Sequence, residues 1–79
     1  VKQRIAEAFI YLEENFGKDK NGYLALTLSR EDIANVVGTA TESAIRIISD
    51  FKKLGLIKAS GKKVAIADRN GLNEVAKGS

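Results

Sequence analysis

The chain has 79 residues, with 13 basic and 10 acidic side chains, and it contains no histidine, cysteine or proline. A chain of this length forms one domain with a thin hydrophobic core. Without histidine and cysteine it lacks the ligands of ordinary zinc sites, the usual catalytic triads and any disulfide. We therefore expect one domain over residues 1–79 that is not an enzyme and binds no metal. Because the chain starts at Val1 rather than at methionine, we interpret it as part of a longer protein.

Basic residues are concentrated in the second half of the chain. Residues 1–35 hold five basic and six acidic residues, whereas residues 36–79 hold eight basic and four acidic residues. A positive surface favours a polyanionic partner such as nucleic acid, although an unevenly charged solvated surface has the same composition. No apolar run approaches the roughly 20 residues that span a bilayer, so we expect no membrane partner.

The first predicted element is an amphipathic helix over residues 2–16. Its apolar residues recur at steps of three and four and share one face: Ile5, Ala8, Phe9, Leu12 and Phe16. Gly17 follows where a helix commonly ends, and residues 17–22 form a polar loop. Residues 23–28 are short and partly alternating, which favours a strand.

A second helix of about two turns is predicted after Ser29. Serine is a favourable N-cap, and the acidic Glu31 and Asp32 suit the positive end of the helix dipole. The expected buried face consists of Ile33, Val36 and Val37. Gly38 ends this helix, and the small Ala34 suits a close crossing with the helix that follows.

A third helix is predicted over residues 39–54. Thr39 and Glu42 match a capping box, in which the threonine caps the helix and the glutamate bonds back to the cap amide. The expected buried face consists of Ala44, Ile47, Ile48, Phe51 and Leu54, and the exposed face of Thr41, Glu42, Ile45, Arg46, Ser49 and Lys53. Gly55 ends the helix. Two helices joined by a glycine turn form a helix-turn-helix, or an ordinary helical hairpin in a small bundle.

The remaining elements favour the first of these alternatives. Residues 56–59 and 63–67 are short alternating runs, and residues 60–62 form a tight turn between them. A hairpin directly after the third helix is typical of a wing. Asp68 is a good N-cap for a last helix over residues 69–77, whose inward residues are Leu72, Val75 and Ala76. The predicted fold is therefore a winged helix-turn-helix, mainly α with a small β-hairpin wing.

Residues 28–46 and the segment after them resemble the DNA-binding domain of Crp/Fnr-type bacterial transcription regulators. The matching residues are Ser29, Arg30, Ile33, Ala34, Val37, Gly38, Glu42, Ser43 and Arg46, followed by Phe51, Gly55, Leu56, Ile57, Gly61 and Lys62. The resemblance covers the chain from the first helix through the wing. The run Glu-Ser-x-x-Arg at this distance after the turn glycine is far more specific than a helix-turn-helix pattern alone.

The resemblance implies a homodimeric, cytoplasmic bacterial transcription regulator that binds a palindromic site on double-stranded DNA. The helix over about 39–54 would lie in the major groove. An N-terminal sensor domain like those that bind cyclic nucleotides would be missing from this chain. The full-length protein would hold a cyclic nucleotide or another effector there, and this part of it would hold no cofactor. RNA polymerase is a further partner that the resemblance implies.

Three residues of the third helix are candidates for base readout: Thr41, Glu42 and Arg46. A glutamate accepts from the cytosine amino group, and an arginine donates two hydrogen bonds to guanine, so Glu42 and Arg46 suit G·C pairs. The alternative is a surface ion pair between them. Thr41 stands where some relatives carry a guanine-binding arginine, and it suits a thymine methyl group or a phosphate instead. We therefore expect a TGA-like half-site with less demand for the outer guanine. Ile45 suits a thymine methyl group or is simply exposed.

A second group of residues is expected to bind phosphates and position the domain. It consists of Ser29, Arg30, Thr39, Ser43, Ser60, Gly61 and Lys62. For the serines and threonines the alternative role is helix capping. A winged-helix module that binds protein is the alternative for the whole chain, because this fold serves both purposes. Such a module should expose an apolar patch on the third helix, where this sequence places only Ile45.

Overall fold

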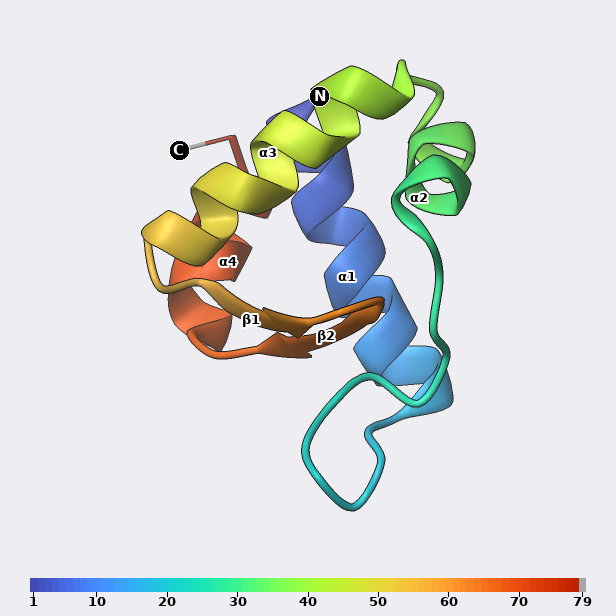
Figure 1. The fold of residues 1–79 in the computed structure, drawn as a ribbon. Helices are drawn as coiled ribbons and strands as arrows, with labels where there is room; N and C mark the ends of the chain where they lie inside the picture. The colour runs from blue at the N-terminus through green and yellow to red at the C-terminus, as the bar shows by residue number, and fades with distance from the viewer. Residues whose placement is uncertain (79) are drawn as a thin grey trace.

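The computed structural model describes residues 1–78 as four helices and one hairpin (Figure 1). In chain order the elements are α1 (Lys2–Phe16), α2 (Arg30–Val37), α3 (Thr41–Lys53), β1 (Ile57–Ser60), β2 (Lys63–Ile66) and α4 (Arg69–Ala76). Figure 1 shows α1 running through the middle, with α2 and α4 on opposite sides and α3 crossing it. None of the helices in this part of the chain is long and apolar enough to span a membrane.

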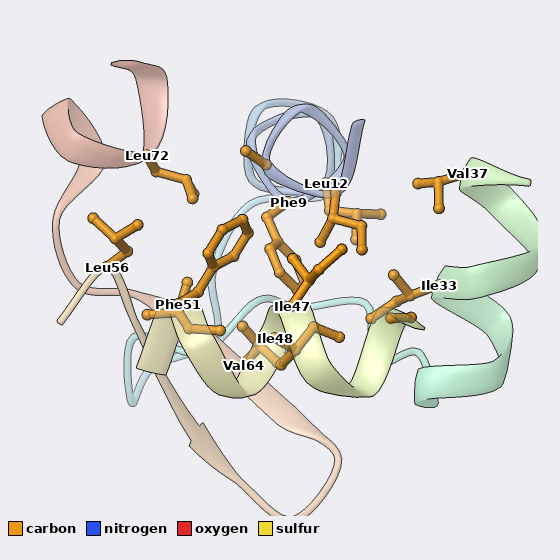
Figure 2. Close-up of a cluster of buried hydrophobic side chains, with 14 of the residues drawn as sticks. Phe9, Leu12, Ile33, Val37, Ile47, Ile48, Phe51, Leu56, Val64 and Leu72 are labelled. Atoms are coloured by element: carbon orange, nitrogen blue, oxygen red, sulfur yellow. The ribbon is translucent and has the colours of Figure 1, made fainter. Parts of the chain in front are cut away.

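The core lies where α1 and α3 cross and extends under the hairpin and α4. Phe9 of α1 and Phe51 of α3 are both 1% exposed. Figure 2 shows their rings between the two helices, with Leu72 of α4 at one end of the cluster and Ile33 of α2 at the other. Burying side chains of this size is the main source of stability in so small a domain. The predicted helix over residues 2–16 and its inward-facing Ile5, Phe9 and Leu12 are confirmed, whereas Phe16, predicted on the same face, is 52% exposed at the end of the helix.

The helix α2 begins with a complete capping box. The Asp32 N–H donates to Ser29 Oγ at 3.1 Å, and the Ser29 N–H donates to Asp32 Oδ2 at 3.2 Å. The helix ends at Gly38, which has φ 76 and ψ 40, a left-handed conformation that favours glycine. The prediction that Val36 is buried was wrong, since it is 69% exposed. At about 100° per residue, the inward stripe passes through positions 33, 34 and 37, and position 36 lies outside it.

The strand predicted for residues 23–28 does not form. One isolated antiparallel bridge joins Lys18 and Leu24. The Leu24 N–H also donates to the Val64 carbonyl of β2 at 2.8 Å. After Leu24 the chain turns away from β2 toward α2. Only this residue of the segment therefore makes a backbone hydrogen bond to the hairpin. Leu24 is buried and Leu26 is 38% exposed, so the leucines of this segment do not share one buried face.

The predicted hairpin is confirmed and forms the wing. Its antiparallel register pairs Ile57 with Ile66 and Ser60 with Lys63, leaving Gly61 and Lys62 as a two-residue turn. Gly61 has φ 60, which such a turn requires at its first central position. Ile57 and Val64 are buried, so one face of the wing closes the core and the other meets solvent. A helix-turn-helix followed by this hairpin is a winged helix-turn-helix.

The last helix, α4, is held at its N-terminal end by two neighbouring residues. The Gly71 N–H donates to Asp68 Oδ1 at 3.0 Å, which confirms Asp68 as the N-cap. Arg69 forms ion pairs with Glu13 and Glu14 of α1, the latter at 2.9 Å. These contacts fasten the segment that follows the wing onto α1.

Candidate nucleic-acid interface

The start of α3 differs in detail from the sequence prediction. The N-cap is Ala40 rather than Thr39, and no side chain caps this end. Thr39 lies in the turn, where its N–H donates to the Ala34 carbonyl at 2.9 Å. Glu42 is consequently the second helical residue, one position short of where it would bond back to the cap. The predicted Thr39–Glu42 capping box was therefore wrong, and Glu42 has no capping role.

The exposed face of α3 carries the candidate base-contacting side chains. Glu42, Arg46 and Ser49 are exposed, Thr41 is half-buried, and Ile45 is 49% exposed. The opposite face, made of Ala44, Ile47, Ile48 and Phe51, is buried as predicted. Leu54, predicted to be buried with them, is 69% exposed because the helix ends at Lys53 and Leu54 is its C-cap.

Glu42 and Arg46 lie one turn apart without pairing. Residues at positions i and i+4 of a helix are neighbours on its surface. Within residues 1–78, however, the ion pairs are those of Lys63 with Asp19 and of Arg69 with Glu13 and Glu14. The surface ion pair considered for Glu42 and Arg46 is absent, so both groups keep their hydrogen-bonding capacity for another partner.

The hydroxyl groups near the helix-turn-helix fall into two classes. Ser29 Oγ accepts the capping bond of α2, and its own O–H remains available as a donor. Thr39 and Ser43, by contrast, flank the start of α3 without capping it. Arg30 follows Ser29 as the first residue of α2 and is half-buried. These four residues lie at or beside the N-terminal ends of α2 and α3, where the helix dipoles favour anions.

The wing tip forms a separate cluster of exposed groups. Ser60, Gly61 and Lys62 are all exposed at the turn between β1 and β2. After α3 the chain reverses, and the wing runs back beneath that helix so that its tip points toward the side where α2 lies (Figure 1). The structure thus places the predicted site residues in two groups, one at the helix-turn-helix and one at the wing tip.

Two features near these groups could not be anticipated from the sequence. The loop after α1 contacts the wing through an ion pair between Asp19 and Lys63. An open apolar groove of about 650 Å³ lies between α1, α2 and the segment before α2. It is lined in part by Tyr11, Leu12, Phe16, Leu26, Ile33 and Val36. The groove involves no residue of α3, so it is separate from the exposed face of that helix.

Comparison with known proteins agrees with this geometry. Residues 3–75 match the family model of the Crp-like helix-turn-helix domain. The CRP-like cAMP-activated global transcriptional regulator of Mycobacterium tuberculosis is 36% identical over 70 residues, covering 86% of this chain and 31% of that protein. The transcriptional activator protein FnrA of Stutzerimonas stutzeri is 37% identical over 81 residues, covering 98% of this chain and 32% of that protein.

A solved structure gives the same result. A transcriptional regulator of the CRP/FNR family from Thermus thermophilus superposes with a TM-score of 0.85 at 27% identity, covering 98% of this chain and 40% of that one. The chain spans about a third of the length of the curated relatives that it matches. The family match across residues 3–75, the winged fold and the exposed face of α3 have one common explanation. The chain belongs to the Crp-like helix-turn-helix domain family.

Proposed function

We propose that this chain binds double-stranded DNA sequence-specifically, as the output domain of a Crp/Fnr-type transcription regulator. The observation that carries the proposal is the exposed face of α3. The carboxylate of Glu42 and the guanidinium of Arg46 lie one turn apart on it without an ion pair between them. Both are in the N-terminal half of the helix that this family inserts into the major groove. Membership of the family supports this use of the fold.

Base readout in this proposal comes from Thr41, Glu42 and Arg46. Arg46 donates two hydrogen bonds to the O6 and N7 atoms of a guanine, and Glu42 accepts from the amino group of a cytosine. Thr41 contacts a thymine methyl group or a phosphate beside them. Ile45, which is also exposed on this face, adds an apolar contact with a thymine methyl group. These contacts select a half-site with a G·C pair at its centre.

Phosphate contacts come from both groups of exposed residues. At the helix-turn-helix they are made by Ser29, Arg30, Thr39 and Ser43. At the wing tip they are made by Ser60, Gly61 and Lys62. Such contacts fix the register of the domain on the duplex and supply affinity that does not depend on sequence.

A longer protein that contains this chain would act as a homodimer on a palindromic site. Its remaining length would include a sensor domain that binds a cyclic nucleotide or another effector, and it would contact RNA polymerase in the cytoplasm. The M. tuberculosis relative is named as cAMP-activated, which supports an effector of this kind. The chain spans only about a third of these relatives, so the sensor domain and its effector are proposed for a longer protein that contains it.

A protein-binding winged helix is less well supported. That function favours an apolar patch on the exposed face of α3, where Ile45 is the one large apolar residue. The exposed apolar side chains gather instead in the groove beside α1 and α2. A docking partner there would leave the face of α3 accessible to DNA.

A selection from a pool of randomised duplexes tests the proposed function. The chain is expected to enrich duplexes that share a short half-site containing G·C, and its affinity should fall steeply with salt concentration. Recovery of unselected sequences, together with affinity that does not depend on salt, would contradict the proposal. A tandem copy of the chain, joined by a flexible linker, raises the affinity into a convenient range without changing the half-site.

A further inference from the structure

The loop after α1 holds a carboxylate in a fixed position. Asp19 Oδ1 accepts hydrogen bonds from the N–H groups of Asn21, at 2.8 Å, and Tyr23, at 3.0 Å. The Asp19 N–H donates to the Tyr23 carbonyl at 2.7 Å. One oxygen of the carboxylate thus closes the loop, and the other remains for an interaction outside it.

That second oxygen faces the wing. Asp19 Oδ2 lies 3.8 Å from Lys63 Nζ. The same loop reaches the next residue of β2, because the Leu24 N–H donates to the Val64 carbonyl at 2.8 Å. Since Leu24 and Val64 are both 4% exposed, a buried contact holds the loop beside the wing. The position of the carboxylate is therefore set by the fold around it, whereas the side chain of Lys63 is 53% exposed.

Lys63 stands beside the candidate phosphate-binding residues of the wing. The register places it directly opposite Ser60, and it follows Lys62 in the chain. Because Val64 points into the core, side chains alternate so that Lys63 lies on the outer face. Residues directly opposite in an antiparallel pair lie about 5 Å apart. A phosphate that contacts Ser60 would thus be within reach of the Lys63 ammonium group.

We propose that Lys63 is a further phosphate-binding residue of the wing and that Asp19 withholds it from DNA. The Asp19 carboxylate and a DNA phosphate compete for the same ammonium group, and the side chain of Lys63 is 53% exposed, which leaves it accessible to either. Affinity from phosphate contacts is independent of sequence. By masking one such contact, Asp19 lowers the affinity for specific and random duplexes alike and leaves the base contacts of α3 unchanged. The proposal rests on the proposed DNA-binding function and adds a control on its overall affinity.

The variant Asp19→Asn tests this directly. Asparagine keeps an oxygen that accepts the two loop hydrogen bonds, and it removes the charge that holds Lys63. Glu74→Gln is the matched control, because it removes one negative charge from an exposed position on α4. The measured quantity is the slope of log affinity against log salt concentration, with a random 20-base-pair duplex as the probe.

Each extra phosphate contact steepens this slope by about 0.9. Asp19→Asn should therefore steepen it by about 0.9 relative to Glu74→Gln. Lys63→Gln should leave the wild-type slope unchanged, and in the Asp19→Asn background it should cancel the increase. Asp19→Ser serves as a second variant, because serine also forms local hydrogen bonds in turns. Circular dichroism on each variant establishes that the fold is intact.

Equal slopes for Asp19→Asn and Glu74→Gln would overturn the proposal, as would an increase that persists when Lys63 is replaced. Either result leaves salt-dependent binding of the wild-type chain in place, so the proposed function would survive. Absence of salt-dependent binding by the wild-type chain would instead overturn the proposed function, and this inference with it.

Discussion

Arg46 follows Glu42 by one turn on the exposed face of α3, and no ion pair joins them in the part of the chain that the structure describes. A helix usually gains only about 0.2–0.5 kcal/mol from such a pair. A bidentate contact to a base discriminates by about 1–3 kcal/mol. Under the proposed function, these two side chains would therefore contribute more on DNA than an ion pair between them would contribute to the stability of α3.

Replacing Arg46 by alanine should weaken binding to the selected duplex by about 1–3 kcal/mol and flatten the preference at one base pair. The physical reason is the loss of two hydrogen bonds to a single guanine. Binding titrations on the selected duplex and on a set of single-base variants measure both effects. If specific and random duplexes lose affinity equally, Arg46 contacts the backbone and not a base.

Replacing Lys62 by alanine should weaken all duplexes alike. This residue lies at the wing tip, where a phosphate contact carries no sequence information. Its loss should make the salt dependence shallower by about one unit on a log–log plot. Lys53→Ala, at the far end of α3, is a control with the same change in charge. An unchanged slope for Lys62→Ala would remove the wing tip from the interface.

The isolated chain should bind a single half-site weakly, and a linked pair of chains should bind a palindrome much more tightly. Joining two modules makes the second binding event intramolecular, which raises affinity by about 10²–10⁴-fold when the linker spans both sites. Titration of the single chain and of the tandem copy on the same palindrome measures this gain. Nanomolar binding by the single chain would contradict the expectation that half of the binding energy is missing.

Replacing Ser29 separates its two roles. Ser29→Ala removes the cap acceptor of α2 and should lower the free energy of unfolding by about 1 kcal/mol. Ser29→Asp keeps a good cap and introduces a negative charge where a phosphate is expected. Urea denaturation should thus find Ser29→Asp more stable than Ser29→Ala, whereas duplex titration should find it the weaker binder. Equal DNA affinity of Ser29→Asp and the wild-type chain would leave Ser29 with capping alone.

Replacing Gly71 by alanine should destabilise the domain by about 1–3 kcal/mol, as overfilling a well-packed site does. A Cβ at this position would lie 2.6 Å from both Leu56 Cδ2 and Asp68 Oδ2. Leu56 is buried in the core and Asp68, although exposed, is held by its capping bond to the Gly71 N–H, so a shift of either side chain has a cost. Urea denaturation measures the loss, and Asn70→Ala, at the exposed neighbouring position, is the control. A loss no greater than that of Asn70→Ala would mean that the site adapts.

Local patterns in the sequence predicted most of this fold. The stripe of α1, the cap at Ser29, the hairpin turn at Gly61 and the cap at Asp68 all depend on residues close in the chain. The errors at Val36, Thr39 and Leu54 concern the face or the ends of single helices, whereas the strand was wrong because a distant contact decides the outcome. Residues 23–28 alternate like a strand, but the wing edge offers a partner only at Leu24.

The candidate site could also be predicted only in part. The sequence placed Glu42 and Arg46 on one exposed face, because their spacing fixes that relationship in any helix. It placed the N-cap of α3 one residue too early, since threonine is the better capping residue and the turn nevertheless makes Ala40 the N-cap. The pair of Asp19 and Lys63 joins residues 44 positions apart, a distance at which local spacing carries no information.

The ion pairs of Arg69 with α1 have a mechanical consequence. The wing connects α3 to α4 along the chain, and both of these helices pack against α1. A rotation of α1 would therefore move α3 and the wing together. The common attachment to α1 therefore keeps the exposed face of α3 and the wing tip at one spacing, whatever the orientation of the domain.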